Sequence, residues 1–187
     1  GWTHNAASGR YEGGYSLSRW TKHKFGDGIY DFTFTPIAET EAGTCKCYVA
    51  FLSQSSQTNT YFDGINWYGA TYYLEIIPGL NMLYVNYNTG TGATSSMQNI
   101  GSIVLPSTVG AVGTSSKFRL RINNNVLQVE LNGVLAKSSV TLSKGLSEGY
   151  FGVSGVWSAS PGPYKFGISD IQIIAASSDA TNGIAAC

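Results

Sequence analysis

Short runs of alternating apolar and polar residues dominate the chain, and turn residues separate them. Residues 117–138, KFRLRINNNVLQVELNGVLAKS, contain three such runs joined by an Asn-Asn pair and an Asn-Gly pair. Both central positions of a two-residue type I′ turn need positive φ, which Asn and Gly adopt more readily than other residues. The segment therefore predicts a three-stranded antiparallel meander with one buried side and one solvent-facing side.

The order of residues within this meander also predicts which side chains face one another. We expect the first turn at Asn123-Asn124, which pairs Leu120 with Leu127, Phe118 with Val129, Arg119 with Gln128 and Lys117 with Glu130. The Asn132-Gly133 turn then pairs Val129 with Ala136 and Glu130 with Leu135. Because apolar residues collect on one side, we expect these side chains in the core: Phe118, Leu120, Leu127, Val129 and Leu131.

The rest of the chain shows many strand patterns and no helical apolar stripe. In residues 28–36 three aromatic residues alternate with polar ones and predict an aromatic inner face: Tyr30, Phe32 and Phe34. Further strands are expected at 47–53, 72–77, 81–87, 149–155 and 164–175, and Pro78-Gly79 joins the second and third of these as a hairpin. Ten or more short strands predict an all-β fold, a two-sheet antiparallel β-sandwich.

Length and composition indicate one domain over residues 1–187, with a core of about 25–174 and terminal strands that pack at its edge. Aromatic residues make up 13% of the chain and charged residues only 12%, as is common in secreted sugar-binding modules and virion surface proteins. Eleven basic residues balance eleven acidic ones without a concentrated positive face, which disfavours nucleic acid binding. No run approaches the roughly 20 apolar residues of a membrane span. We therefore expect an extracellular, secreted or virion-surface protein.

The chain has three cysteines, an odd number. Cys45 and Cys47 lie too close in an extended segment to bridge each other. Our first hypothesis is that one of them pairs with Cys187, and the alternative is that all three are reduced thiols. Zinc is disfavoured because both histidines, His4 and His23, lie far from the cysteine pair in sequence.

The strand order resembles a known structural grouping. An FGDGIYDFTF strand, a central hairpin, the FRLRINNNVLQVELNGVLA meander, GYFGVSG and a closing YKFGISDIQI strand follow one another between residues 25 and 174. This order is similar to the concanavalin A-like lectin and glucanase jelly roll, which includes laminin-G-like domains. The resemblance implies a closing strand beside the first one, with sugars bound on the concave sheet or in loops at one edge. Members of the grouping differ in function, so the fold alone cannot choose among them.

The carboxylates test whether the chain is an enzyme. Retaining glycosidases of the laminarinase type carry two Glu and an Asp alternating on one strand, and the chain has no such E-x-D-x-E pattern. Glu39 and Glu41 have the right spacing but lie in a loop-like PIAETEAGTC segment, so we expect no catalytic role for them. Polysaccharide lyases of this fold use His among other residues, and His4 and His23 show no such arrangement. No nucleophile elbow is present.

Residues 59–73, NTYFDGINWYGATYY, have the chemistry of a sugar site. Sugar rings stack on flat aromatic side chains, and their hydroxyls need polar groups around the rim. Trp67 and Tyr68 lie between two glycines, next to Asn66 and near Asp63, so we expect them on a loop. Tyr72 and the loop residue Trp157 are further candidates, although aromatic residues of strands often belong to the core. Trp2 and Trp20 are expected to cover the edge of the sandwich.

Three functions follow from these observations. We favour a non-catalytic carbohydrate-binding, lectin-like domain that recognises a glycan or polysaccharide. The alternatives are a viral or phage surface domain for attachment or assembly, and a polysaccharide-degrading glycoside hydrolase or lyase. We expect no cofactor; a structural calcium at Asp27, Asp31 and Asp170 is the alternative, although no Asp-rich calcium loop is visible. Oligomerisation is compatible with each of these functions.

Overall fold

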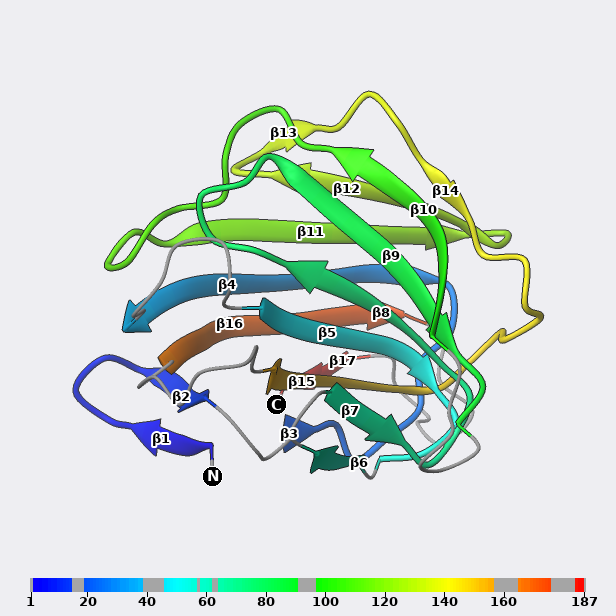
Figure 1. Cartoon of the computed structure of the whole chain (residues 1–187), viewed down its shortest axis with the longest axis horizontal. Coiled ribbons are helices and arrows are strands. Elements are labelled where there is room, and N and C mark those ends of the chain that lie inside the picture. Colours follow the sequence, from blue (N-terminus) through cyan, green and yellow to red (C-terminus); the bar gives the residue numbers. More distant parts are fainter. Residues whose placement is uncertain are drawn as a thin grey trace.

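Two antiparallel sheets pack face to face and form a jelly-roll β-sandwich (Figure 1). The computed structural model describes residues 2–14, 19–38, 46–56, 58–61, 64–90, 97–156, 165–175 and 184–186. All regular secondary structure in these ranges is β-strand, as the alternating pattern predicts. The described residues include no helix that could span a membrane. The predicted fold class, a two-sheet antiparallel sandwich, is thus confirmed.

The larger sheet has nine strands within the described ranges. Seven of them follow one another in the order β1 (Thr3–Asn5), β2 (Arg10–Gly14), β16 (Lys165–Ala175), β4 (Gly28–Ala38), β11 (Ser116–Asn123), β12 (Val126–Leu131) and β13 (Val134–Leu135). Two short strands join at the sides: β14 (Val140–Thr141) pairs with β12, and β17 (Ile184–Ala186) pairs with β16. The closing strand β16 therefore lies beside β4, as the resemblance implied.

The smaller sheet has six strands within the described ranges. Their order is β10 (Met97–Val104), β9 (Met82–Asn88), β8 (Thr71–Ile76), β5 (Lys46–Ser53), β15 (Tyr150–Val156) and β3 (Arg19–Trp20). Between β5 and β8 the chain forms a separate two-stranded hairpin, β6 (Thr58–Tyr61) and β7 (Gly64–Trp67), at the lower edge of the view in Figure 1. The predicted hairpin around Pro78-Gly79 is the β8–β9 pair.

The core lies between the two sheets and is rich in aromatic residues. Tyr30, Phe32 and Phe34 of β4 are at most 1% exposed, and the ring of Phe32 stacks on that of Phe118 at 5.2 Å between centroids. The five meander residues predicted to face the core are each at most 2% exposed. Burial of this apolar area is the main favourable contribution to folding.

The first turn of the meander differs from the prediction. Asn124 and Asn125 have φ of 48° and 62°, so they form the turn, and Leu120 pairs with Val129 and Phe118 with Leu131. The amide of Asn124 donates a hydrogen bond of 2.8 Å to Asp27 Oδ2. This contact with a distant residue selects among three consecutive asparagines. The shift of pairing by two positions leaves every side chain on its predicted face, because the side-chain period of a strand is two.

The second turn and its pairing are confirmed. Asn132 and Gly133 have φ of 51° and 81°, as a type I′ turn requires. Glu130 pairs with Leu135, and the amide of Ala136 donates to the carbonyl of Val129 at 2.9 Å.

A β-bulge in β16 changes which residues face the core. Phe166 and Ile168 are buried, Asp170 adopts φ of 54°, and the pairing with β4 shifts by one residue between Ser169 and Gln172. Beyond the bulge Ile173 is buried instead of Gln172. One extra residue therefore reverses the alternation that the sequence shows in this segment.

Cys47 lies in the core as a free thiol, and burial raises its pKa. A buried neutral thiol packs as a small apolar residue and is chemically inert. Cys45 and Cys187 lie outside the described residues, so the hypothesis of a pairing with Cys187 stays a prediction.

Candidate functional site

The outer face of the six-stranded sheet, on the side away from the core, carries an unusual mixture of aromatic and amide side chains. Alternation along β5, β8 and β9 buries one set of residues in the core and turns the other outward. The pairing of the strands places the outward residues in rows that cross the sheet. We call this surface the outer face. Its first row contains Ser102, Tyr84, Glu75 and Tyr48. Its second row contains Asn99, Asn86, Tyr73, Ala50, Gly152 and Trp20.

The first row is centred on Glu75, which is 6% exposed and forms an ion pair of 2.6 Å with Lys46. Tyr48 lies opposite Glu75 on one side and is 7% exposed, whereas Tyr84 lies opposite on the other side and is 37% exposed. Burial, together with the negative charge of Glu75, raises the pKa of Tyr48. Tyr48 therefore stays a neutral phenol, and Tyr84 offers an accessible ring on β9, next to the edge strand β10.

The second row joins amides at one end to an aromatic cluster at the other. Asn99 Nδ2 donates to Asn86 Oδ1 at 3.1 Å, and Asn86 lies opposite Tyr73. Tyr73 is 1% exposed and its ring lies 4.9 Å from that of Tyr48, with the ring planes tilted by 48°. These rings form a small apolar cluster outside the main core.

Trp20 packs against this cluster from the edge strand β3. A Cβ atom at Gly152 would overlap the Trp20 ring, so the indole lies directly over the glycine backbone. Trp20 is only partly buried. The sequence placed Trp20 at the edge of the sandwich, and the structure adds that its ring belongs to the outer face.

A third row closes the face near the β6–β7 hairpin. The hydroxyls of Ser53 and Thr71 are 2.7 Å apart, and Thr71 Oγ1 also donates to the Gly69 carbonyl at 2.7 Å. Asn88 Oδ1 accepts a hydrogen bond of 2.8 Å from the amide of Gly90. These groups are held by the protein itself, so their role is to fix the strand ends.

The outer face suits the binding of a polyhydroxylated molecule. Aromatic rings can pack against the C–H faces of a sugar, and amides and hydroxyls can bond its hydroxyl groups. Glycosidic hydrolysis by the two-carboxylate mechanism needs a pair of carboxyl groups about 5 Å or more apart. Among the described strands of this sheet, Glu75 is the one acidic residue, and it is neutralised by Lys46.

The structure places the predicted site residues in several environments. Tyr68 is 49% exposed in a bend after β7, which agrees with an accessible aromatic residue. The backbones of Asn66 and Trp67 form part of strand β7, so these residues lie in a hairpin and not in the expected loop. Asp63 and Trp157 lie outside the described residues.

Tyr72 has a different role from the other candidates. It is fully buried, its ring stacks on that of Phe51 at 5.8 Å, and its hydroxyl accepts a hydrogen bond of 2.6 Å from the amide of Lys144. A ring with no exposed area cannot stack on a ligand. Tyr72 therefore belongs to the core, as strand aromatics commonly do, while its neighbour Tyr73 points to the outer face.

The candidates for catalysis and calcium binding do not assemble into a site in the described residues. Glu39 and Glu41 lie outside these ranges. Nowhere in the described chain do three or more His, Cys, Asp or Glu side chains gather as metal ligands. Asp31 is held by Arg119 in a two-pronged ion pair of 2.8 and 2.7 Å, and Asp27 accepts the hydrogen bond from Asn124.

A second polar surface lies on the outside of the nine-stranded sheet. It is an open groove of about 460 Å³ whose lining includes Asp31, Arg119 and Glu130, and Arg119 pairs with Asp31 at 2.7 Å. Arg121 pairs with Glu130 at 2.6 Å. No aromatic ring of the groove is exposed, since Phe32 and Phe118 are buried. This groove is therefore less suited to a sugar ring than the outer face.

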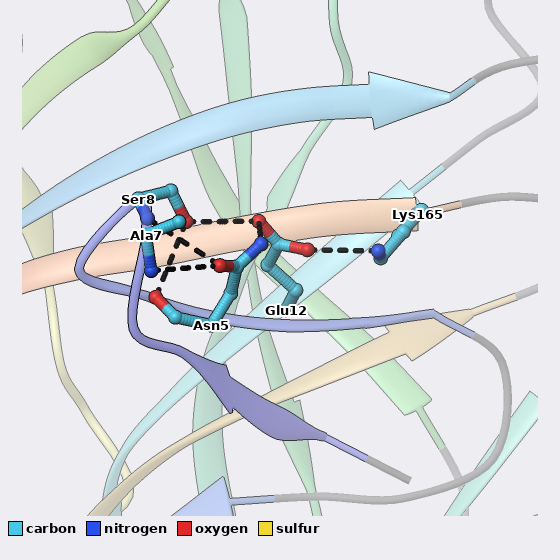
Figure 2. Close-up of polar contacts among 5 residues, drawn as sticks. All are labelled: Asn5, Ala7, Ser8, Glu12 and Lys165. Carbon is cyan, nitrogen blue, oxygen red and sulfur yellow. Dashed lines mark hydrogen bonds and ion pairs between the residues drawn. The ribbon is translucent and has the colours of Figure 1, made fainter.

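A polar cluster fixes the N-terminal hairpin to the nine-stranded sheet. Figure 2 shows Asn5, Ser8 and Lys165 converging on the carboxylate of Glu12, with distances of 3.0, 3.0 and 2.7 Å. These contacts, led by the one from Lys165, lower the pKa of Glu12. Because every contact is made within the protein, the cluster stabilises the fold.

The sequence matches no protein-family model and no curated protein. Solved structures, however, share its fold. The carbohydrate-binding module CBM66 from Bacillus subtilis has a TM-score of 0.61 at 13% identity, with 91% of this chain and 89% of that chain covered. The carbohydrate recognition domain of Emp47p has a TM-score of 0.61 at 17% identity, with coverage of 92% and 86%. A β-glucanase from Bacillus licheniformis has a TM-score of 0.51 at 13% identity, with coverage of 89% and 78%.

At these identities the likeness shows the fold alone, and it is consistent with a concanavalin A-like sandwich. The similar structures include both binding domains and glycosidases, so the choice of function rests on the side chains of this chain.

Sequence reasoning missed the residues of the outer face: Trp20, Tyr48, Tyr73, Glu75, Tyr84, Asn86 and Asn99. A signal for some of them was present in the hairpin around Pro78-Gly79. Once Leu74, Ile76, Leu83 and Val85 are assigned to the core, the alternation turns the polar residues of both strands outward together. The sequence did not indicate that Trp20 lies on the outer face, because a strand of two residues is too short to show an alternating pattern.

Proposed function

We propose that this domain binds a carbohydrate without cleaving it and that the ligand lies on the outer face. The proposal rests on the mixture of side chains there: the amides of Asn99 and Asn86 lie in one row with Trp20, and the exposed ring of Tyr84 lies in the row beside them. Polar groups alone would suit many ligands, and rings alone would suit a protein partner. Their mixture is typical of sugar recognition.

The shared fold supports the proposal. Two of the similar structures are described as a carbohydrate-binding module and a carbohydrate recognition domain, and they cover most of this chain. The β-glucanase supports carbohydrate as the ligand class and leaves cleavage to be decided by the carboxylates. The low charged content, 12%, fits an extracellular or virion-surface location, which we propose as well.

The experiment is a glycan array, followed by retention on insoluble polysaccharides. Tyr84→Ala removes an exposed ring of the outer face and should weaken binding about fivefold, because stacking contributes on the order of 1 kcal/mol. Gln172→Ala, on the opposite face of the sandwich, is the control and should bind like the parent. The melting temperatures of both variants should stay close to that of the parent, since both side chains are exposed.

Trp67→Ala and Tyr68→Ala test the site predicted from the sequence. If either of these variants loses binding while Tyr84→Ala retains it, the ligand binds at the β6–β7 hairpin and not on the outer face. A parent protein that binds no glycan would contradict carbohydrate binding and favour a role in attachment or assembly without sugar.

A further inference from the structure

The charge of the outer face restricts the class of ligand. In the six-stranded sheet, strands β5, β8, β9, β10 and β15 contain two charged residues, Lys46 and Glu75. Lys46 Nζ and Glu75 Oε1 are 2.6 Å apart, so the two charges neutralise each other. An acidic polysaccharide needs basic side chains that are available to its carboxylates or sulfates. These five strands provide one basic residue, and it is already paired.

Asn99 determines how the amide of Asn86 is oriented. Asn99 Nδ2 lies within hydrogen-bond distance of three acceptors, namely Asn86 Oδ1, the Gly101 carbonyl and, at 3.5 Å, the Val85 carbonyl. Three acceptors on one side of the Asn99 amide show that its nitrogen, and not its oxygen, lies on that side. Because that nitrogen meets the oxygen of Asn86, the Nδ2 of Asn86 must point the other way.

Asn86 Nδ2 has no hydrogen-bond partner among the described residues, although Asn86 is only 2% exposed. A buried donor without a partner is destabilising, and native structures rarely keep one unless water or a ligand supplies the acceptor. Its neighbours on the outer face include Tyr84, two residues away on the same strand, and Asn99, which lies opposite. Both neighbours are exposed to solvent.

We infer that the outer face takes an uncharged glycan and that Asn86 Nδ2 donates a hydrogen bond to one of its oxygen atoms. This inference rests on the proposed function and adds the ligand class and the residue that selects it. A sugar hydroxyl, a ring oxygen or an acetamido carbonyl can accept from the amide. The exposed ring of Tyr84 then packs against the same sugar.

The first test compares neutral and acidic polysaccharides as probes. Mixed-linkage β-glucan, xylan and galactomannan are neutral; alginate, polygalacturonate and κ-carrageenan are acidic. We expect the parent protein to be retained by at least one neutral probe and by no acidic probe, with the same affinity in low and high salt. Retention by acidic probes alone, weakened by salt, would overturn the inference and leave carbohydrate binding standing. Retention by no probe would overturn the proposed function itself, and the inference with it.

The second test uses Asn86→Ala with Asn88→Ala as the matched control. Both residues are 2% exposed and lie on the same face of β9, but Asn88 accepts a hydrogen bond from the amide of Gly90. We expect Asn86→Ala to weaken binding of the neutral probe about tenfold and to lower the melting temperature less than Asn88→Ala does, because it removes an unpartnered donor and leaves Asn99 Nδ2 with the Gly101 and Val85 carbonyls as acceptors. Asn88→Ala should lower the melting temperature. An Asn86→Ala variant with parental affinity would overturn the role of Asn86.

A measurement on the parent protein covers the case in which Asn86→Ala does not fold. The side-chain amide resonances of Asn86 should shift when a soluble oligosaccharide of the retained neutral polysaccharide is added. The side-chain amide resonances of Asn81, which lies in the connection between β8 and β9, should not shift. If the Asn86 signals do not move at saturation, the hydrogen bond is absent.

Discussion

At the scale of single residues, the face on which a side chain lies decides what a substitution does. Val129 is fully buried at the centre of β12, whereas Val126, three residues earlier on the same strand, is 36% exposed. The two positions share residue type and strand, so they separate the effect of burial from that of local sequence.

Val129→Asp should unfold the domain. An unpaired carboxylate in an apolar core is among the most damaging single changes and costs about 4 kcal/mol or more. Val126→Asp should lower the free energy of unfolding by less than about 1 kcal/mol. Thermal and urea unfolding monitored by circular dichroism measure both. A cooperative melt of Val129→Asp near the parental temperature would show that Val129 does not face the core.

At the scale of elements, the N-terminal hairpin of β1 and β2 depends on polar contacts as well as on strand pairing. Lys165 starts β16 and pairs with Gly14 in the backbone register, while its ammonium group reaches Glu12 at 2.7 Å (Figure 2). Glu12 thus connects the hairpin to β16, and the ion pair with Lys165 forms only while the Glu12 carboxylate is ionised.

The lowered pKa of Glu12 predicts a loss of stability in acid. In the unfolded chain this carboxyl has its ordinary pKa, near 4.3 in model peptides. The stabilisation is therefore complete above that value and disappears as the pH falls through the lower pKa of the folded state. Melting temperatures between about pH 7 and pH 3 should fall less steeply for Glu12→Gln than for the parent.

Glu148→Gln is the control for this prediction, because the Glu148 side chain forms no ion pair with any described residue. It should keep the parental pH dependence. If Glu12→Gln and the parent lose stability in parallel, the cluster around Glu12 does not contribute to acid sensitivity.

At the scale of the whole molecule, the described strands of the six-stranded sheet carry one carboxylate, Glu75, on the outer face, where we propose that the sugar binds. General acid catalysis and nucleophilic attack need two carboxyl groups. The domain should therefore release no reducing ends and no unsaturated products from the polysaccharides it binds.

Reducing-sugar and absorbance assays measure this absence of turnover directly. Glu39→Gln and Glu41→Gln should leave stability and binding unchanged. Glu75→Gln should lower stability, because Lys46 loses its partner. Turnover by the parent that any of these three variants abolishes would establish the domain as an enzyme.

The sequence determined the all-β fold class, the Asn132-Gly133 turn of the meander and the side of the sheet on which each meander residue lies. The reason is local: alternation in hydrophobicity has the same period as the strand, and Asn and Gly adopt positive φ at little cost. Even the shift of the first turn to Asn124-Asn125 left these faces unchanged, because it moved the pairing by two residues.

Only the tertiary structure decided the register and the composition of the outer face. The hydrogen bond from Asn124 to Asp27 joins residues 97 positions apart, and no local pattern indicates which asparagine forms it. In the same way, Trp20 of β3 and Tyr73 of β8 share the outer face only because β5 and β15 lie between their strands in the folded sheet. A binding surface depends on which strands pair, and strand pairing results from the burial of the whole core rather than from any one segment.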